Sequence, residues 1–146
     1  MLSSLFVGID VSAKDNKVQL LKSDGSEVSR FSVPNTFLGA KILSDKVVKV
    51  MSEGTYDSLV VGLEATSVYG DHLVYFIKED AAINTFRPKL HVLNPKQVAN
   101  FKKAYPDIPK NDWVDAWIIA DNLRFGRITK EVYMDDYRYD ALQNLT

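Results

Sequence analysis

Two alternating runs of apolar and polar residues on either side of Asp24-Gly25 constrain the fold of this chain more than any other feature. Residues 17–33 read KVQLLKSDGSEVSRFSV, and an Asp-Gly pair between two such runs is a strong signal for a tight β-hairpin. The segment before the hairpin, residues 4–10, is apolar and contains residues that favour strands. We therefore expect the chain to begin with three antiparallel strands.

Helical and strand patterns alternate after this hairpin. Leu43, Val47 and Met51 recur at helical spacing between lysines, which predicts an amphipathic helix over residues 35–51. Residues 58–65, SLVVGLEA, form a short and continuously apolar run, the pattern of a strand that is covered on both faces. Further patterns predict a helix over 68–80, a strand over 89–94, a helix over 95–105 that Asn94-Pro95 opens, and a last helix within 109–127.

The resulting order, βββαβαβα, predicts an α/β fold with a mixed five-stranded sheet and helices on both faces. Right-handed crossover connections would place the strand of residues 58–64 parallel to that of residues 4–10 and next to it. Ligands of such open sheets gather at the carboxyl ends of the parallel strands. We therefore expect the chemistry of this chain at that edge of the sheet.

Four carboxylates can meet at this edge. The first and fourth strands end alike, as VGID and VGLE, so Asp10 and Glu64 each follow a glycine by two positions. In the last helix, Asp112 and Asp115 are three residues apart and would share one helix face with the small residue Ala116. Each acid alone has a simpler interpretation, such as a turn residue, a solvated acid or a partner of the helix dipole. Their joint placement favours a common site.

Four acids without an arginine among them would repel one another in a partly desolvated site. Divalent cations relieve this repulsion, and carboxylate oxygens suit Mg²⁺, with Mn²⁺ as a substitute. Two such ions can stabilise both the attacking and the leaving oxygen of a phosphodiester. The pattern therefore predicts a Mg²⁺-dependent enzyme that cleaves nucleic acid, and leaves open a domain that binds nucleic acid without cleaving it.

Four stretches of the sequence carry a wider resemblance: GIDVSAKDNKVQLL with Asp10, GLEATSVYGDHL with Glu64, HVLNPKQVANFKKA, and KNDWVDAWIIADNLRFG with Asp112 and Asp115. They resemble the amino-terminal, RuvC-like domain of the DEDD transposases of insertion-sequence family 110, relatives of the Piv invertases and of the RuvC Holliday-junction resolvases. The family often has Glu-x-Thr-Gly-x-Tyr and Lys-Thr-Asp where this chain reads EATSVY and KND, but no carboxylate is lost.

The resemblance implies an RNase H-like fold, a DEDD metal site made of these four acids, and DNA strand cleavage and transfer during transposition. It also implies DNA as the partner, a homo-oligomer in a longer protein and, in some members, a structured or guide RNA that chooses the DNA site. Relatives carry a second, carboxy-terminal domain with a serine implicated in strand exchange. We expect residues 1–130 to form the catalytic domain and residues 131–146 to begin a connecting helix, so that this chain alone binds metal yet fails to join DNA ends.

The charge distribution singles out one segment. The chain has a net charge of -1, but residues 87–110 hold six basic residues against one acid and carry +5. A basic stretch that precedes the acidic helix predicts contacts with nucleic-acid phosphates, although such runs are often only solvated faces. The six residues are Arg87, Lys89, Lys96, Lys102, Lys103 and Lys110.

Composition indicates an ordinary globular domain, with 46% hydrophobic and 25% charged residues. The sequence contains no cysteine and no run of ~20 apolar residues that could span a bilayer. Its start lacks the basic region and the long apolar stretch of a secretory signal. These features predict a cytoplasmic protein without membrane association.

The histidines and tryptophans of the sequence, and two alternative functions, are weaker candidates than the four carboxylates and the transposase function. His72 and His91 lack neighbours at zinc-ligand spacing and are interpreted as structural. Trp113 and Trp117 are interpreted as packing residues, with base stacking as the alternative.

A nuclease that resembles the Holliday-junction resolvases is an alternative function on the same fold. An actin-like ATPase is another, but its first phosphate loop normally contains a glycine that the sequence VSAK lacks.

Overall fold

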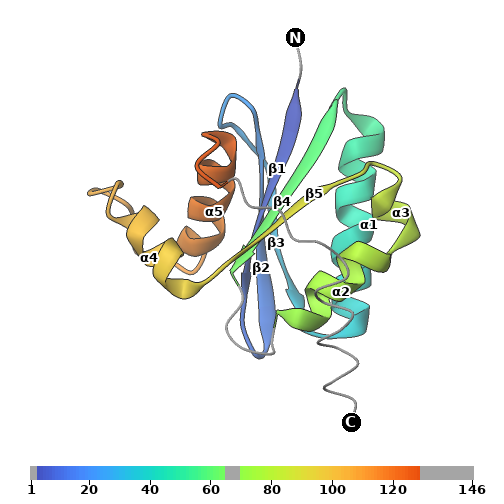
Figure 1. Cartoon of the computed structure of the whole chain (residues 1–146), viewed down its shortest axis with the longest axis horizontal. Coiled ribbons are helices and arrows are strands. Elements are labelled where there is room, and N and C mark those ends of the chain that lie inside the picture. The colour runs from blue at the N-terminus through green and yellow to red at the C-terminus, as the bar shows by residue number, and fades with distance from the viewer. Residues whose placement is uncertain (1–2, 65–69, 129–146) are drawn as a thin grey trace.

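A five-stranded mixed sheet with the order β3-β2-β1-β4-β5 forms the centre of the molecule (Figure 1). The computed structural model describes residues 3–64 and 70–128. The helix expected over residues 131–146 lies outside these two stretches. The strands are β1 (Ser4–Val11), β2 (Asp15–Lys22), β3 (Glu27–Pro34), β4 (Ser58–Glu64) and β5 (Lys89–Leu93).

The strand pairing confirms the expected meander and the expected crossover. β1 pairs antiparallel with β2, and β2 with β3, while β4 lies parallel to β1 and β5 lies parallel to β4. The hairpin between β2 and β3 turns at Gly25, whose φ of 87° is in the left-handed region that glycine adopts without strain. Asp24 supports the turn because its carboxylate accepts hydrogen bonds from the backbone and the side chain of Ser26.

The helices are α1 (Phe37–Glu53), α2 (Asp71–Glu79), α3 (Ala81–Asn84), α4 (Pro95–Lys102) and α5 (Val114–Arg124). They cover both faces of the sheet, as expected: α1, α2 and α3 lie on one side, and α4 and α5 lie on the other (Figure 1). Within the described residues, no helix combines the length and the apolar character that crossing a membrane requires.

Strand alternation divides the interior into two cores. Val7 and Ile9 of β1 belong to the larger core, which α1, α2 and α3 close. Phe6 precedes Val7 in the same strand but packs on the opposite face of the sheet, with apolar residues of α4 and α5. Successive strand residues point to opposite faces. The even-numbered residues of β1 and β4, which include Asp10 and Glu64, therefore lie on the α5 side of the sheet.

Side-chain caps explain where α3 and α4 begin. The helix expected over residues 68–80 corresponds to α2, which ends at Glu79. The short α3 follows, because the side chain of Asp80 accepts a hydrogen bond from the backbone N–H of Ile83. The sequence predicted the end of α2 near residue 80 but did not predict α3. α4 begins where expected, because the side chains of Asn94 and Gln97 form a capping box.

Candidate metal centre

Three carboxylates meet where β1 and β4 end and α5 begins. Asp10 and Glu64 occupy paired positions of the two parallel strands, and Asp115 lies in the first turn of α5. One carboxylate oxygen from each residue lies within 4.8 Å of those of the other two. In residues 3–64 and 70–128, this is the one group of acids, histidines or cysteines arranged closely enough to hold a metal ion.

The glycines that precede the strand acids allow α5 to approach the sheet. A Cβ atom on Gly8 would stand 2.1 Å from the backbone oxygen of Ala116 and 2.6 Å from the backbone nitrogen of Ala120. A Cβ atom on Gly62, which pairs with Gly8, would stand 2.9 Å from Cγ2 of Ile119. The repeated Gly-x-acid pattern therefore has a structural cause, because the glycines seat the helix whose first turn completes the acidic cluster.

Asp112 does not join this cluster. α5 begins at Val114, so Asp112 lies in the preceding turn, is exposed, and does not share a helix face with Asp115. Asn111 shapes this turn because its side-chain oxygen accepts a hydrogen bond of 2.9 Å from the backbone N–H of Trp113. The i, i+3 placement expected from the sequence is thereby corrected, although Asp112 still lines the hollow in which Asp115 lies.

Burial disfavours the charged forms of the two strand acids. Glu64 is only 9% exposed, and its Oε2 atom has no hydrogen-bond partner among the described residues. This burial, together with repulsion from Asp10 and Asp115, raises the pKa of Glu64 to about 7. Burial and the neighbouring Asp115 raise the pKa of Asp10 to about 6. A cation between the acids would supply the missing partner and favour their ionised forms.

Two lysines partly offset the negative charge. Lys102, in the last turn of α4, forms an ion pair with Asp115. Lys17 of β2 stands opposite Asp10 in the strand register and lines the same hollow, although its own ion pair, at 3.4 Å, is with Asp15. Both lysines lower the pKa of Asp10, and Lys102 also lowers that of Glu64, but burial outweighs them in each case. The lysines therefore reduce the repulsion between the acids without removing it.

The three carboxylates fit a hard divalent cation. Mg²⁺ binds oxygen at about 2.0–2.1 Å, so two of its ligands lie at most about 4 Å apart. Small side-chain rotations would bring the three oxygens to that spacing, since they already lie within 4.8 Å of one another. Neither His72, which is exposed on α2, nor His91, which is buried in β5, belongs to the group.

The basic residues between positions 87 and 110 do not form one surface. Arg87 and Lys89 lie at the amino end of β5, whereas the acids lie at the carboxyl ends of β1 and β4. Lys102 and Lys110 line the hollow that also contains Asp10, Asp112 and Asp115, which we call the acidic hollow. The segment is therefore divided between two ends of the sheet, and the exposed ends of α4 carry the remaining two residues, Lys96 and Lys103.

Sequence reasoning did not single out a second acid of α5, Asp121. This residue is 3% exposed, and its Oδ2 atom accepts a hydrogen bond of 2.7 Å from the hydroxyl of Tyr105. Its Oδ1 atom accepts hydrogen bonds of 3.0 and 2.8 Å from Nε and Nη2 of Arg124. These bonds tie the segment after α4 to α5. Tyr105 and Asp121 are 16 residues apart, so no local pattern reveals their contact.

Known proteins resemble this chain in sequence and in fold. The family model for DEDD transposases of insertion-sequence family 110, described as a transposase, matches residues 7–146. No curated protein matches the chain. The solved structure of Thermus thermophilus RuvC is 12% identical, with a TM-score of 0.57 over 86% of this chain and 96% of that one.

RuvC from the same organism in complex with a Holliday junction substrate is 13% identical, with a TM-score of 0.50 over 87% of this chain and 96% of that one. At this level of identity the similarity concerns the fold alone. It confirms the expected RNase H-like architecture.

Proposed function

The chain belongs to the DEDD transposases of insertion-sequence family 110, and we propose that its acidic centre cleaves DNA strands with the help of a divalent cation. An all-carboxylate site suits Mg²⁺, with Mn²⁺ as a substitute. Asp10, Glu64 and Asp115 are the proposed ligands. We retain Asp112 as a further proposed ligand, because it lines the same hollow and its exposed side chain is free to turn toward the cluster.

The convergence of three carboxylates from three separate elements carries this proposal. Each acid makes the ionisation of its neighbours less favourable, and one oxygen of Glu64 is buried without a partner among the described residues. Such an arrangement destabilises the protein when no cation is bound. Perturbed acids at the carboxyl ends of parallel strands are typical of functional sites in sheets of this kind.

A divalent cation bound there would neutralise charge on a phosphate and lower the pKa of a water molecule. The paired strands hold Asp10 and Glu64 in a fixed register, which provides the rigid part of the site. Lys102, beside Asp115, can offer its ammonium group to a phosphate oxygen where negative charge develops. Lys17 lines the same hollow and would contact a neighbouring phosphate without reading sequence.

Two classes of DNA substrate fit this centre. Family membership favours the ends of an insertion sequence, which a transposase must cleave. The second candidate is a four-way junction, and the observation that favours it is the similarity in fold to RuvC, which has been solved with a Holliday junction substrate. Both substrates require the same phosphodiester chemistry, so they differ in the DNA shape that the rest of the surface accepts.

A nicking assay tests the proposal. The purified chain is incubated with a plasmid that carries the ends of its insertion sequence, or with a synthetic four-way junction, in Mg²⁺, Mn²⁺ or EDTA. We expect nicks with either cation and none in EDTA, and we expect Asp10→Asn to lower the rate by about 100-fold or more. Preferential cleavage of the junction would favour the resolvase-like function. DNA binding without cation-dependent cleavage of any substrate would contradict the proposal.

A further inference from the structure

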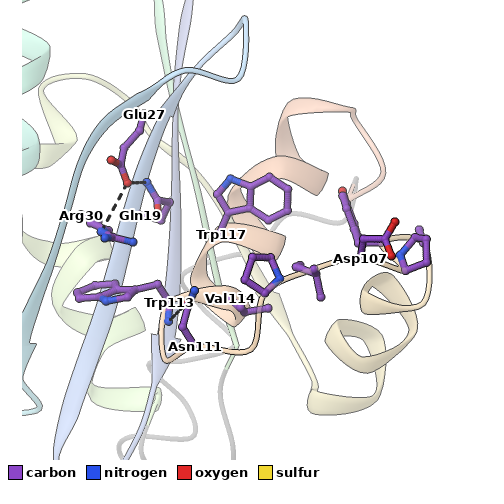
Figure 2. A pocket seen from close by; sticks show the side chains of 13 residues that line it. Gln19, Glu27, Arg30, Asp107, Asn111, Trp113, Val114 and Trp117 are labelled. Carbon is purple, nitrogen blue, oxygen red and sulfur yellow. Dashed lines mark hydrogen bonds and ion pairs between the residues drawn. The ribbon is translucent and has the colours of Figure 1, made fainter.

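A second hollow, with aromatic walls, is shown in Figure 2, and it shares part of its lining with the acidic hollow. Its volume is about 550 Å³, and it lies between β2, β3, the segment that links α4 to α5, and the first turns of α5. Four of its lining residues also line the acidic hollow: Ile108, Pro109, Asn111 and Val114. A strand that passes the acidic hollow can therefore continue directly into the aromatic one.

Half-buried aromatic rings form the walls of this hollow. Trp113 precedes α5 and Trp117 lies in its first turn, so both point from the same end of the helix (Figure 2). Tyr105 packs edge to face against Trp117, with ring centroids 5.3 Å apart. The guanidinium of Arg30 lies 5.4 Å from the centroid of Trp113. Aromatic faces with an adjacent guanidinium are the surfaces on which unpaired bases stack.

A buried amide supplies a polar group at the side of the hollow. Gln19 is only 2% exposed, and its Nε2 atom donates hydrogen bonds of 2.9 Å to Glu27 Oε1 and 3.4 Å to the backbone oxygen of Ser29. In the described part of the chain, no group donates to its side-chain oxygen. The hollow therefore offers an unused acceptor beside the cationic Arg30, which suits the mixed donors and acceptors of a base edge.

We propose that this hollow binds one unstacked nucleotide base of the strand whose phosphate lies at the metal centre. The inference rests on the proposed function, because that function fixes which polymer passes the acids. A base held in a duplex is stacked and paired, so the nucleotide must be unpaired or turned out of the helix. The bound base would set the position of the scissile phosphate relative to Asp10 and Asp115.

Charge and continuity favour a nucleotide over a protein segment as the occupant. The lysines that line the acidic hollow, Lys17, Lys102 and Lys110, attract a phosphate backbone. The aromatic hollow, whose charged lining residues are Arg30, its partner Glu27 and Asp107, suits the uncharged base of the same nucleotide. An apolar peptide would cover the half-exposed Arg30–Glu27 pair and the Gln19 acceptor without offering them polar groups, which disfavours its binding.

The tryptophans provide a direct reporter of occupancy. The 146-residue sequence contains two tryptophans, and both line the hollow. The whole chain, in EDTA to prevent cleavage, is titrated with a short dye-labelled single strand of DNA or RNA, and dye anisotropy reports binding. On an unlabelled strand of the same sequence, we expect tryptophan emission to fall at least twofold at saturation. A strand with an abasic position opposite the hollow should bind but quench less.

Single substitutions locate the effect. Trp113→Leu should weaken binding of the intact strand about tenfold, because stacking on one aromatic ring is lost. Arg30→Gln changes a half-exposed side chain, so it keeps the test available if the tryptophan variant does not fold. Arg30→Gln should reduce the quenching of tryptophan emission by the intact strand. Phe37→Leu alters a residue that is 76% exposed and lies outside the hollow, and should leave affinity within about twofold.

The outcomes separate this inference from the proposed function. Strand binding without a change in tryptophan emission, or equal quenching by intact and abasic strands, would overturn the base pocket even if cation-dependent cleavage occurs. A fall in tryptophan emission per molecule as protein concentration rises, in the absence of any nucleic-acid strand, would assign the hollow to a second copy of the chain. This result would also overturn the base pocket. Quenching that persists in Asp10→Asn would support the pocket independently of catalysis, whereas absence of strand binding would contradict both proposals.

Discussion

α5 carries two acids in opposite environments. Asp121 is buried and its oxygens accept hydrogen bonds from Tyr105 and Arg124. Asp115, six residues earlier, faces Asp10 and Glu64 and forms an ion pair with Lys102. The difference shows that burial does not by itself mark a functional acid. Asp121 has the partners that a stable buried carboxylate requires. In the cluster around Asp115 the three carboxylates repel one another, and a bound cation would relieve this repulsion.

Gly8→Ala should have the largest effect, because it displaces the part of α5 that carries Asp115. The new Cβ atom would meet backbone atoms of Ala116 and Ala120, which cannot rotate away. We expect a loss of about 3 kcal/mol in the free energy of unfolding, together with loss of Mn²⁺ binding. In the matched variant Gly62→Ala, the new atom meets side-chain atoms, and we expect a loss of about 1 kcal/mol. Equal losses in urea unfolding would contradict a backbone contact specific to Gly8.

The pH dependence of stability should expose the unsatisfied cluster. In EDTA, the raised pKa values of Asp10, about 6, and Glu64, about 7, mean that the folded protein binds more protons than the unfolded chain above about pH 4. The resulting stabilisation is present below the unfolded pKa values and is lost as pH rises through the folded ones. We expect a loss on the order of 3 kcal/mol between about pH 4.5 and pH 8.

Urea unfolding across this range measures that loss, and the double variant Asp10→Asn/Glu64→Gln is the control. Neither replacement side chain titrates, so its profile should be flatter than that of the wild type. A wild-type profile that rises with pH, or a double variant with the wild-type slope, would show that the two strand acids are not destabilised by their surroundings.

Asp121→Asn should lower stability without removing the metal centre. One of its accepting oxygens becomes a donor facing Tyr105 or Arg124, so we expect a loss of about 2 kcal/mol in the free energy of unfolding. Asp45→Asn on the exposed face of α1 should change stability by less than about 0.5 kcal/mol. Thermal unfolding and Mn²⁺ calorimetry check both effects. A large loss of Mn²⁺ affinity in Asp121→Asn would contradict the distinction between the two acids of α5.

Lys102→Met should have the smallest effect of these variants, and it should strengthen Mn²⁺ binding where Gly8→Ala abolishes it. Its half-exposed ion pair with Asp115 competes with a cation for the same oxygen. Removal of a pair worth about 0.5–1 kcal/mol should tighten Mn²⁺ binding about two- to fivefold. The exposed neighbour Lys103 provides the control variant Lys103→Met, which should leave the affinity unchanged. Weaker Mn²⁺ binding in Lys102→Met would mean that the lysine positions Asp115 instead of competing for it.

The sequence predicted the two strand acids because their positions follow from the register of the sheet. Once β1 and β4 are parallel neighbours, the shared Gly-x-acid endings require Asp10 and Glu64 to stand side by side. The placement of Asp112 on a shared helix face with Asp115 was wrong, because the start of a helix depends on the local turn that precedes it. The hydrogen bond from Trp113 N–H to Asn111 sets a turn there, and the helix begins after it.

Contacts between distant segments could not be predicted in this way. The Tyr105 bond to Asp121 and the aromatic hollow both form where the segment after α4 meets α5, and neither follows a period in the sequence. The basic stretch illustrates the opposite error. Arg87 and Lys102 belong to the same basic stretch of the sequence. Arg87 precedes the amino end of β5, whereas Lys102 lies in the last turn of α4, so the two residues belong to different surfaces.

Anomalous diffraction from crystals grown with Mn²⁺ tests the central claim most directly, because it locates the ion without reference to activity. We expect a Mn²⁺ peak within coordination distance of carboxylate oxygens from Asp10, Glu64 and Asp115, with Lys102 displaced from its ion pair and no peak at Asp121. Crystals with no Mn²⁺ between the three carboxylates, or with the ion bound elsewhere on the chain, would contradict the assignment of this cluster as the metal centre.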